Sequence, residues 1–231
     1  MKKHTQFAAL GGVAVALLLA VTTPALGARS GSGVTVRVEG LKHTLLPTTS
    51  AHAESGSITK GGTPKGSCPG SSAAGYFDSA THHRWHGAYS SGLGVEITGV
   101  LGETHRFSAK GFYWGIWIND RFASTGMCDL KLKPGDELLL APAPGSGTTY
   151  PIILTAPAKA KVGQTFSVRT SYFKTGKGRA KALPGVKVTD AGAVTGRGGD
   201  VTVTVTKPGK VTLTATLRGY IRAEATVNVT R

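Results

Sequence analysis

The chain has 231 residues, of which 27 are Lys or Arg and 12 are Asp or Glu, so its formal charge is +15 at pH 7. Because 40% of the residues are hydrophobic, the chain can bury a core, which excludes an intrinsically disordered protein. Its length allows one large domain or two small domains once a targeting segment has been removed.

Residues 1–28 have the parts of a secretory signal peptide. A lysine pair precedes an apolar run at 7–21, and Ala25 and Gly27 are small residues at the spacing of a cleavage site. The run is shorter than the roughly 20 residues that span a bilayer, and an uncleaved anchor is the alternative. We therefore expect a secreted protein that is extracellular or loosely associated with the cell surface.

Cys68 and Cys128 are the two cysteines of the chain. An exported protein folds in an oxidising compartment, and an even count leaves no thiol over. We therefore predict a disulfide between Cys68 and Cys128, with two buried free thiols as the alternative. Closing a loop of this length stabilises the fold by up to about 4 kcal/mol in the chain-entropy model.

The first half of the chain mixes strand-like runs with one helical segment. Strands are predicted at 34–38, 44–49, 95–97, 113–118 and 137–140. Ser71 and Ser72 are suitable caps for a short helix in which Ala74, Phe77 and Ala80 share one face. A hairpin, a helix and further strands favour a small α+β domain, with the helix on one face of a mixed sheet.

Three stretches of this half carry a resemblance to a known family: VTVRVEG, SCPGSSAAGYFDSATHHRW and GFYWGIWINDRFASTGMCDLKLKPGDELLLAPA. They resemble bacterial secreted domains that are similar to the C-terminal β-domain of transcobalamin, with an aromatic strand ending in W-x-x-x-x-N and a later P-G-D. The resemblance implies a β-grasp-like fold and a binding or structural role. The transcobalamin domain closes over cobalamin, but the large helical partner domain is missing here, so we expect no cofactor.

The second half shows strand-like alternation throughout. Six strands are predicted at 151–155, 165–170, 186–189, 201–205, 210–217 and 224–229. Within 211–217 the apolar residues occupy every second place, so one face is expected in a core and a row of threonines in water. The stretch LPGVKVTDAGAVTGRGGDVTVTVTKPGKVTLTATLRGYIRA resembles the immunoglobulin-like repeats of bacterial surface and secreted proteins.

The small, turn-favouring residues at 141–149 predict a linker between the two halves. We place a β-grasp-like domain at 29–143, the linker at 144–149 and an immunoglobulin-like domain at 150–231. The predicted fold class is therefore an α+β β-grasp-like domain followed by an all-β immunoglobulin-like sandwich.

Three histidines surround Trp85. On a continuous helix His82 and His86 would share one face, as metal ligands do, with Asp78 one turn earlier as a carboxylate ligand. This pattern allows a zinc or copper site at His82 and His86. The alternative is a histidine-rich helix end, where imidazoles meet exposed carbonyls.

The aromatic residues of 112–122 have two possible roles. Alternation places Trp114 on one face of the strand and Trp117 on the other, and one of these faces must be core. The other face is either covered by the cysteine-bearing loop or forms a shelf that stacks a sugar ring or a planar ligand. Core packing is the default, and the alternative is a small-ligand pocket formed by Tyr76, Trp85, Trp114 and Trp117.

The positive charge is concentrated after the linker. Residues 146–231 contain 14 Lys and Arg and three Asp and Glu, a net charge of +11, whereas residues 29–145 contain 11 and 9, a net charge of +2. One loop holds Lys174, Lys177, Arg179 and Lys181. Export argues against nucleic acid as the partner and favours anionic cell-envelope polymers or lipid headgroups. A solvated surface that aids solubility is the alternative.

The sequence offers no recognisable catalytic arrangement. Ser90 and Ser91 lack a G-x-S-x-G context, the cysteines are assigned to a disulfide, and the carboxylates have no catalytic spacing. We expect a secreted, non-catalytic binding or structural protein of the bacterial cell surface. A small-ligand-binding protein is the first alternative, and a metal-dependent hydrolase that uses the histidine cluster is the second.

Overall fold

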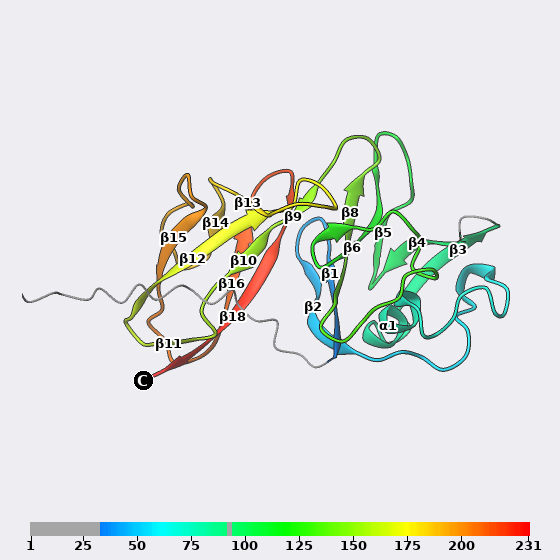
Figure 1. Ribbon diagram of the computed structural model, residues 1–231, viewed down its shortest axis with the longest axis horizontal. Coiled ribbons are helices and arrows are strands. Elements are labelled where there is room, and N and C mark those ends of the chain that lie inside the picture. The colour runs from blue at the N-terminus through cyan, green and yellow to red at the C-terminus, as the bar shows by residue number, and fades with distance from the viewer. Residues whose placement is uncertain (1–32, 92–93) are drawn as a thin grey trace, which may run out of the picture.

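The computed structural model describes residues 33–91 and 94–231 and is mostly β, with 47% strand and 6% helix. Two groups of sheets follow one another along the chain, each with a large hydrophobic cluster of its own (Figure 1). We call residues 33–144 the N-terminal half and residues 145–231 the C-terminal half. The predicted signal peptide at 1–28 lies outside the described residues.

The N-terminal half contains a five-stranded mixed sheet in the order β2-β1-β8-β6-β7. Its strands are β1 (Val34–Glu39), β2 (Thr44–Ala51), β6 (Phe112–Ile118), β7 (Arg121–Phe122) and β8 (Glu137–Pro144). β1 pairs antiparallel with β2 and parallel with β8, and β8 pairs antiparallel with β6. The first strand and the last strand of this half therefore lie side by side.

A second sheet and two short helices complete the N-terminal half. The antiparallel sheet consists of β3 (Trp85–Ser90), β4 (Gly94–Val100) and β5 (Glu103–Thr104). The helices are a 3-10 turn at Lys60–Gly62 and α1 (Ala73–Ala80). None of the helices in the described part of the chain has the length and apolar character that crossing a membrane requires.

One face of the five-stranded sheet forms the N-terminal core. Val36 and Val38 alternate along β1 with Arg37 and Glu39, and the two valines pack in one cluster with α1 and the second sheet. Because successive side chains of a strand point to opposite faces, Arg37 and Glu39 lie on the other face. That face carries charged groups, and the C-terminal half covers it.

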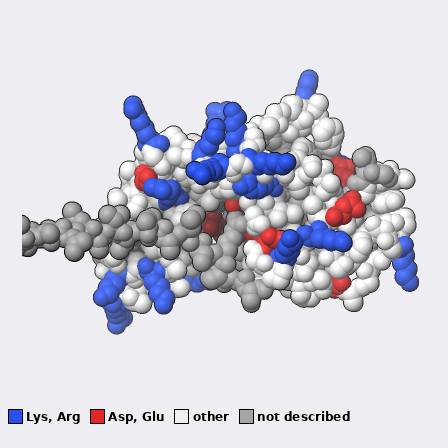
Figure 2. Space-filling view, viewed as in Figure 1, with Lys and Arg blue, Asp and Glu red and all other residues white. Residues whose placement is uncertain are grey.

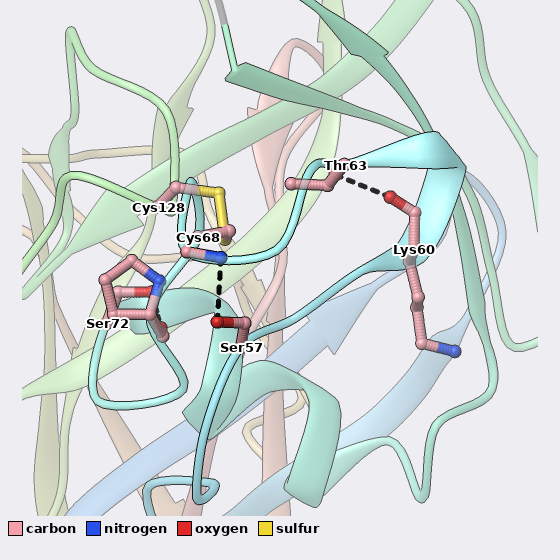
Figure 3. Close-up of a disulfide and its surroundings, with 8 residues drawn as sticks. Ser57, Lys60, Thr63, Cys68, Ser72 and Cys128 are labelled. Carbon is pink, nitrogen blue, oxygen red and sulfur yellow. Dashed lines mark hydrogen bonds between the residues drawn. A yellow bond between two sulfur atoms is a disulfide. The ribbon is translucent and has the colours of Figure 1, made fainter.

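The structure confirms the predicted helix face and the disulfide. Ala74, Phe77 and Ala80 are buried on α1, and a side chain at Gly75 would collide with the carbonyl group of Gly70. Cys68 and Cys128 are joined by a disulfide that ties the loop before α1 to the loop after β7 (Figure 3).

The loop that carries Cys68 is also held by its own hydrogen bonds. The Thr63 hydroxyl donates to the Lys60 carbonyl at 2.6 Å, and the Ser72 hydroxyl donates to the Pro69 carbonyl at 2.6 Å (Figure 3). The Gly66 amide donates to the Ser57 hydroxyl oxygen at 3.0 Å. This long loop therefore has a defined path around the disulfide.

The C-terminal half consists of two four-stranded sheets and one two-stranded pair. In the first sheet β12 (Thr165–Tyr172) pairs with β10 (Ile153–Thr155), β13 (Lys181–Ala182) and β15 (Asp200–Thr204). The second has the order β11 (Lys159–Lys161), β18 (Ala223–Thr230), β16 (Gly209–Thr216), β14 (Lys187–Val188). β9 (Tyr150–Pro151) runs parallel to β17 (Tyr220–Ile221).

The core of the C-terminal half lies between its two larger sheets. Leu213 and Ala215 of β16 are fully buried in it, while Thr212 and Thr216 are exposed. The predicted alternation of apolar side chains and threonines is therefore confirmed on this strand.

Only part of the segment 141–149 forms the linker that its composition predicts. Residues up to Pro144 continue β8, and Ala141 and Ala143 are buried. β1 pairs with β8 only as far as Leu140, so β8 has an open edge beyond this point. Prolines are tolerated at such an edge because no neighbouring strand needs their amide hydrogens. The connection between β8 and β9 consists of residues 145–149.

Candidate functional site

A buried network of charged side chains joins the two halves. Glu39 is 1% exposed and accepts hydrogen bonds from Arg37 Nη1 at 2.8 Å and from Arg222 Nε at 2.9 Å. Arg37 Nη1 also donates to the Arg222 carbonyl at 2.8 Å. The remaining guanidinium nitrogens of Arg222 donate to the carbonyls of Gly40 and Lys42, both at 3.0 Å. The guanidinium group of Arg222, in the C-terminal half, thus donates hydrogen bonds to one carboxylate and two backbone carbonyls at a turn of the N-terminal half.

Arg37 stays positively charged although it is buried. Burial acts to lower the pKa of the Arg37 guanidinium, but the carboxylates of Glu137, Glu39 and Asp120 together outweigh it, so that the pKa of Arg37 is raised. The Thr44 hydroxyl lies 2.9 Å from Glu39 Oε2 and 3.0 Å from Glu224 Oε1. Charged and polar contacts therefore link β1 and β2 to β18.

An apolar cluster lies beside the charged network. Trp117 of β6 is 1% exposed and packs with Leu139, Ala141 and Ala143 of β8 and with Ile221 of the C-terminal half. The Trp117 ring also lies against Gly115, where a Cβ atom would be 2.5 Å from Cη2. The second face of the aromatic strand is therefore covered by the C-terminal half. It is not covered by the cysteine-bearing loop, and it does not form an open shelf.

Arg121 of β7 holds the loop between β12 and β13. Its Nη1 atom donates to the Gly176 carbonyl at 2.9 Å, and its Nη2 atom donates to the Gly178 carbonyl at 3.0 Å. The guanidinium group lies over the Phe173 ring, 3.6 Å from the centroid. A residue of the N-terminal half thus fixes the loop that carries the predicted basic cluster.

A cavity of about 230 Å³ lies at this contact. Its aromatic wall comes from both halves and consists of Tyr113, Trp117, Phe122, Tyr150 and Phe173. Its polar and charged lining consists of Asp120, Arg121, Thr148, Thr149, Lys174 and Thr175. Of these residues, only Trp117 and Lys174 belong to the residue sets that the sequence predicts for binding.

A wider hollow of about 660 Å³ opens at another part of the junction. Phe112 and Leu41 of the N-terminal half line it, together with the turn around Arg218 and Tyr220. Tyr220 packs in a trio with Tyr150 and Tyr172. The pKa of Tyr220 is raised, mainly by burial and to a smaller extent by the neighbouring Tyr172, so this phenol stays protonated at neutral pH.

The basic loop lies directly beside the cavity. Lys174, Lys177 and Arg179 lie on the loop between β12 and β13, whereas Lys181 begins β13, so the prediction of one loop holds for three of the four cations; we keep the name basic loop for the stretch that carries all four. All four are exposed, and Figure 2 shows Lys and Arg side chains gathered over the upper middle of the molecule. Of the fourteen Lys and Arg residues after position 145, only Arg169 and Arg222 form an ion pair within residues 33–91 and 94–231. The positive charge of this half is thus largely unneutralised and open to solvent.

The structure does not bring the four predicted pocket residues together. Trp85 and Trp114 are buried in the N-terminal core, and Tyr76 packs against the same cluster. Trp117 lies on the opposite face of the sheet. The Trp114 indole Nε1 is buried without a hydrogen-bond partner among the described residues, whereas the Trp85 indole donates to Asp78 Oδ1 at 2.6 Å.

The predicted metal pair is also separated. Helix α1 ends at Ala80, and His82 has a positive φ of 50°, so the chain has left the helix before His86, which lies on β3. The i and i+4 relation of the two imidazoles is therefore wrong. His83 is the histidine that reaches Asp78, with 2.7 Å between Nδ1 and Oδ2.

Glu54, Asp78 and His83 place one possible ligand atom each within 4.8 Å of one another. Lys60 Nζ is 3.7 Å from Asp78 Oδ1, and this ammonium group already balances the carboxylate. Trp85 and His83 occupy both oxygens of Asp78. This cluster acts as a hydrogen-bonded support for the end of α1.

The junction is the part of the molecule where both halves contribute to one arrangement. It combines a buried ionic network, an apolar cluster around Trp117 and a cavity beside an exposed basic loop. Comparisons of the chain with family models, with curated proteins and with solved structures found no match.

Proposed function

We propose that the protein is a secreted, non-catalytic binding or structural protein of the bacterial cell surface, and that its C-terminal half associates with anionic polymers of the cell envelope. Residues 146–231 contain 14 Lys and Arg against three Asp and Glu, all of the 14 except Arg222 are exposed, and this excess carries the proposal. A surface with such an excess attracts polyanions over long range. The signal-like residues at 1–28 are the reason for choosing an envelope polymer over a nucleic acid.

We assign a β-grasp-like fold to the N-terminal half. Three features support it: a leading hairpin, a helix on one face of a mixed sheet, and a last strand parallel to the first. A fold of this kind has no fixed activity, so the function must come from the surface it presents.

We assign an immunoglobulin-like fold to the C-terminal half. β12 pairs with β10 and β15, as strand B does with strands A and E of that fold. β16 pairs with β14 and β18, as strand F does with strands C and G. The basic loop would then be the connection between strands B and C of a sandwich.

The hydrogen bonds of Arg121 support a binding role for the basic loop. Arg121 fixes the backbone of this loop through three carbonyls, those of Thr175, Gly176 and Gly178. Its lysine and arginine side chains are therefore presented from a defined backbone, which lowers the ordering cost of binding a polyanion.

We expect neutralisation of the basic loop to weaken binding to cell walls. The test variant carries Lys174→Gln, Lys177→Gln, Arg179→Gln and Lys181→Gln in the protein without its predicted signal peptide. Co-sedimentation with anionic cell walls should fall by at least about tenfold in apparent affinity, because each cation near a polyanion contributes on the order of 1 kcal/mol. Retention of the unchanged protein should fall from about 0.1 M to about 1 M NaCl, as the Debye length shrinks from about 10 Å to about 3 Å.

The matched control removes the same charge from exposed positions of the N-terminal half: Lys65→Gln, Lys110→Gln, Lys131→Gln and Lys133→Gln. This variant should keep most of its retention. Equal losses in both variants, or retention that ignores salt, would contradict the proposal. Binding to anionic vesicles but not to cell walls would assign the surface to lipid headgroups instead.

A further inference from the structure

We propose that the junction cavity binds a single anionic sugar unit, a hexose ring that carries one carboxylate or one phosphate. This inference rests on the proposed function and names the unit of the envelope polymer that is held. The site is composed of side chains from β6, β7 and the β12–β13 loop together with residues 147–150.

The size of the cavity suits one ring. Its volume of about 230 Å³ lies below the roughly 300–1,000 Å³ of pockets for drug-sized ligands. Five aromatic residues from both halves line it, and the partly or fully exposed rings among them, those of Tyr113, Phe122, Tyr150 and Phe173, offer apolar surface to the C–H groups of a sugar, while Trp117 forms the buried back of the wall. Phe122 is 51% exposed and packs edge-on against Trp117, so its ring is accessible at the entrance.

The cavity is also lined by polar groups, which suit a sugar better than a purely apolar ligand. Thr148 and Thr149 line the cavity, and Thr149 is oriented by donating its hydroxyl to the Gly219 carbonyl at 2.9 Å. Its oxygen remains able to accept a hydrogen bond from a ligand hydroxyl. A purely apolar ligand would make no use of these hydroxyl groups, whereas a sugar can hydrogen-bond to them.

The charges of the lining favour an anionic substituent. Arg121 and Lys174 supply two cations against the single carboxylate of Asp120. Asp120 is 5% exposed and interacts electrostatically with the buried guanidinium group of Arg37. The negative charge of Asp120 is therefore partly compensated by Arg37. Lys174 is exposed and forms no ion pair within the described residues, which makes it the group that would meet the anion.

The cavity is continuous with the proposed polymer-binding surface. Lys174 lines the cavity and is also the first of the four cations of the basic loop. A polymer that follows Lys177, Arg179 and Lys181 would therefore bring one of its units to the cavity entrance. The loop would supply attraction and the cavity would supply selectivity for the unit.

The test is titration of the intact protein, without its predicted signal peptide, with D-glucuronate, D-glucose 6-phosphate and D-glucose. Calorimetry gives the affinity, and tryptophan fluorescence reports on the cavity because Trp117 lines it. We expect saturable binding of glucuronate or of glucose 6-phosphate, and binding of neutral glucose about tenfold or more weaker. Which of the two anions binds more tightly distinguishes a uronic acid polymer from a phosphate-bearing one.

Variants separate the cavity from general charge attraction. Lys174→Gln and Phe122→Ala should each reduce the affinity about tenfold, whereas Lys207→Gln, at an exposed position outside the cavity lining, should leave it unchanged. Cooperative melting of all four proteins well above the temperature of the titration would show that each variant is folded.

Three results would overturn this inference: no saturable binding of either anion, glucose binding as tightly as the anions, or benzoate displacing them. Salt-sensitive retention on cell walls together with no sugar binding would leave the proposed function standing and remove the cavity assignment. Sugar binding without retention on cell walls would support the cavity and contradict the proposed function.

Discussion

Replacing Glu39 with alanine is expected to lower the free energy of unfolding by about 3–5 kcal/mol. The substitution leaves Arg37 buried at 4% exposure without its hydrogen-bonded carboxylate, and Arg222 loses its ion pair. Arg37 keeps its contact with Glu137 at 3.5 Å but loses the carboxylate that it contacts most closely, and a buried charge that loses such a partner is costly because the protein interior solvates it poorly. Denaturant unfolding, followed by circular dichroism, measures the change.

A surface carboxylate and a double-mutant cycle provide the controls. Glu96 is exposed on β4, and Glu96→Ala should stay within about 0.5 kcal/mol of the unchanged protein. Glu39→Ala and Arg222→Ala should be coupled by at least about 1 kcal/mol in the double variant, because the two side chains share one ion pair across the junction. Additive effects would mean that the halves are not joined by this network.

Replacing Trp117 with alanine is expected to destabilise the protein by about 3–5 kcal/mol. The indole ring is 1% exposed and packs against Leu139, Ala141 and Ile221, so its removal leaves a cavity between the halves. A tryptophan that served only as a ligand platform could be removed with little loss of stability. Thermal melts of the variant distinguish these two roles.

Phe122→Ala is the matched control for this substitution. Phe122 contacts Trp117 edge-on with 5.5 Å between ring centroids, yet it is 51% exposed. Its removal should therefore cost much less stability than the removal of Trp117. A loss below about 1 kcal/mol for Trp117→Ala would contradict the covered junction that the structure shows.

Local patterns predict the strands whose two faces differ. In β16 the period-two alternation places Leu213 and Ala215 inside, and this holds because one face of that strand packs on a core. The spacing of Ala74, Phe77 and Ala80 likewise predicts α1, whose inner face packs on the mixed sheet. These two elements can be predicted because their pattern of buried and exposed residues is set by residues close together in the chain.

β3 could not be predicted from its own residues. Its sequence WHGAYS has only Trp85 and Tyr89 as β-forming residues, separated by residues that do not favour strands, and the preceding histidines suggest that a helix continues. The strand forms because Trp85 enters the N-terminal core and Gly87 allows close approach of Val95, whose Cγ2 would lie 2.6 Å from an added Cβ. Tertiary packing therefore overrides the local pattern, and the predicted His82 and His86 pair fails for the same reason.

The junction was beyond sequence reasoning because its partners lie far apart in the chain. Arg37 alternates with valines and is typical of a side chain that faces water, but its partner Arg222 is 185 positions away. Charge counting did identify the basic loop around Lys174. It could not show that Arg121 would hold that loop beside a cavity, because this contact depends on how the halves pack.

Amide hydrogen exchange with and without a polyuronic acid tests the central claim most directly, using the intact protein without its predicted signal peptide at low salt. The polymer should slow exchange in the basic loop at 173–182 and in the cavity-lining residues 147–150, which lie together at the junction. The β3, β4 and β5 sheet should exchange as before. Protection confined to that sheet or to α1, or no protection anywhere at low salt, would contradict a polyanion site on the basic loop.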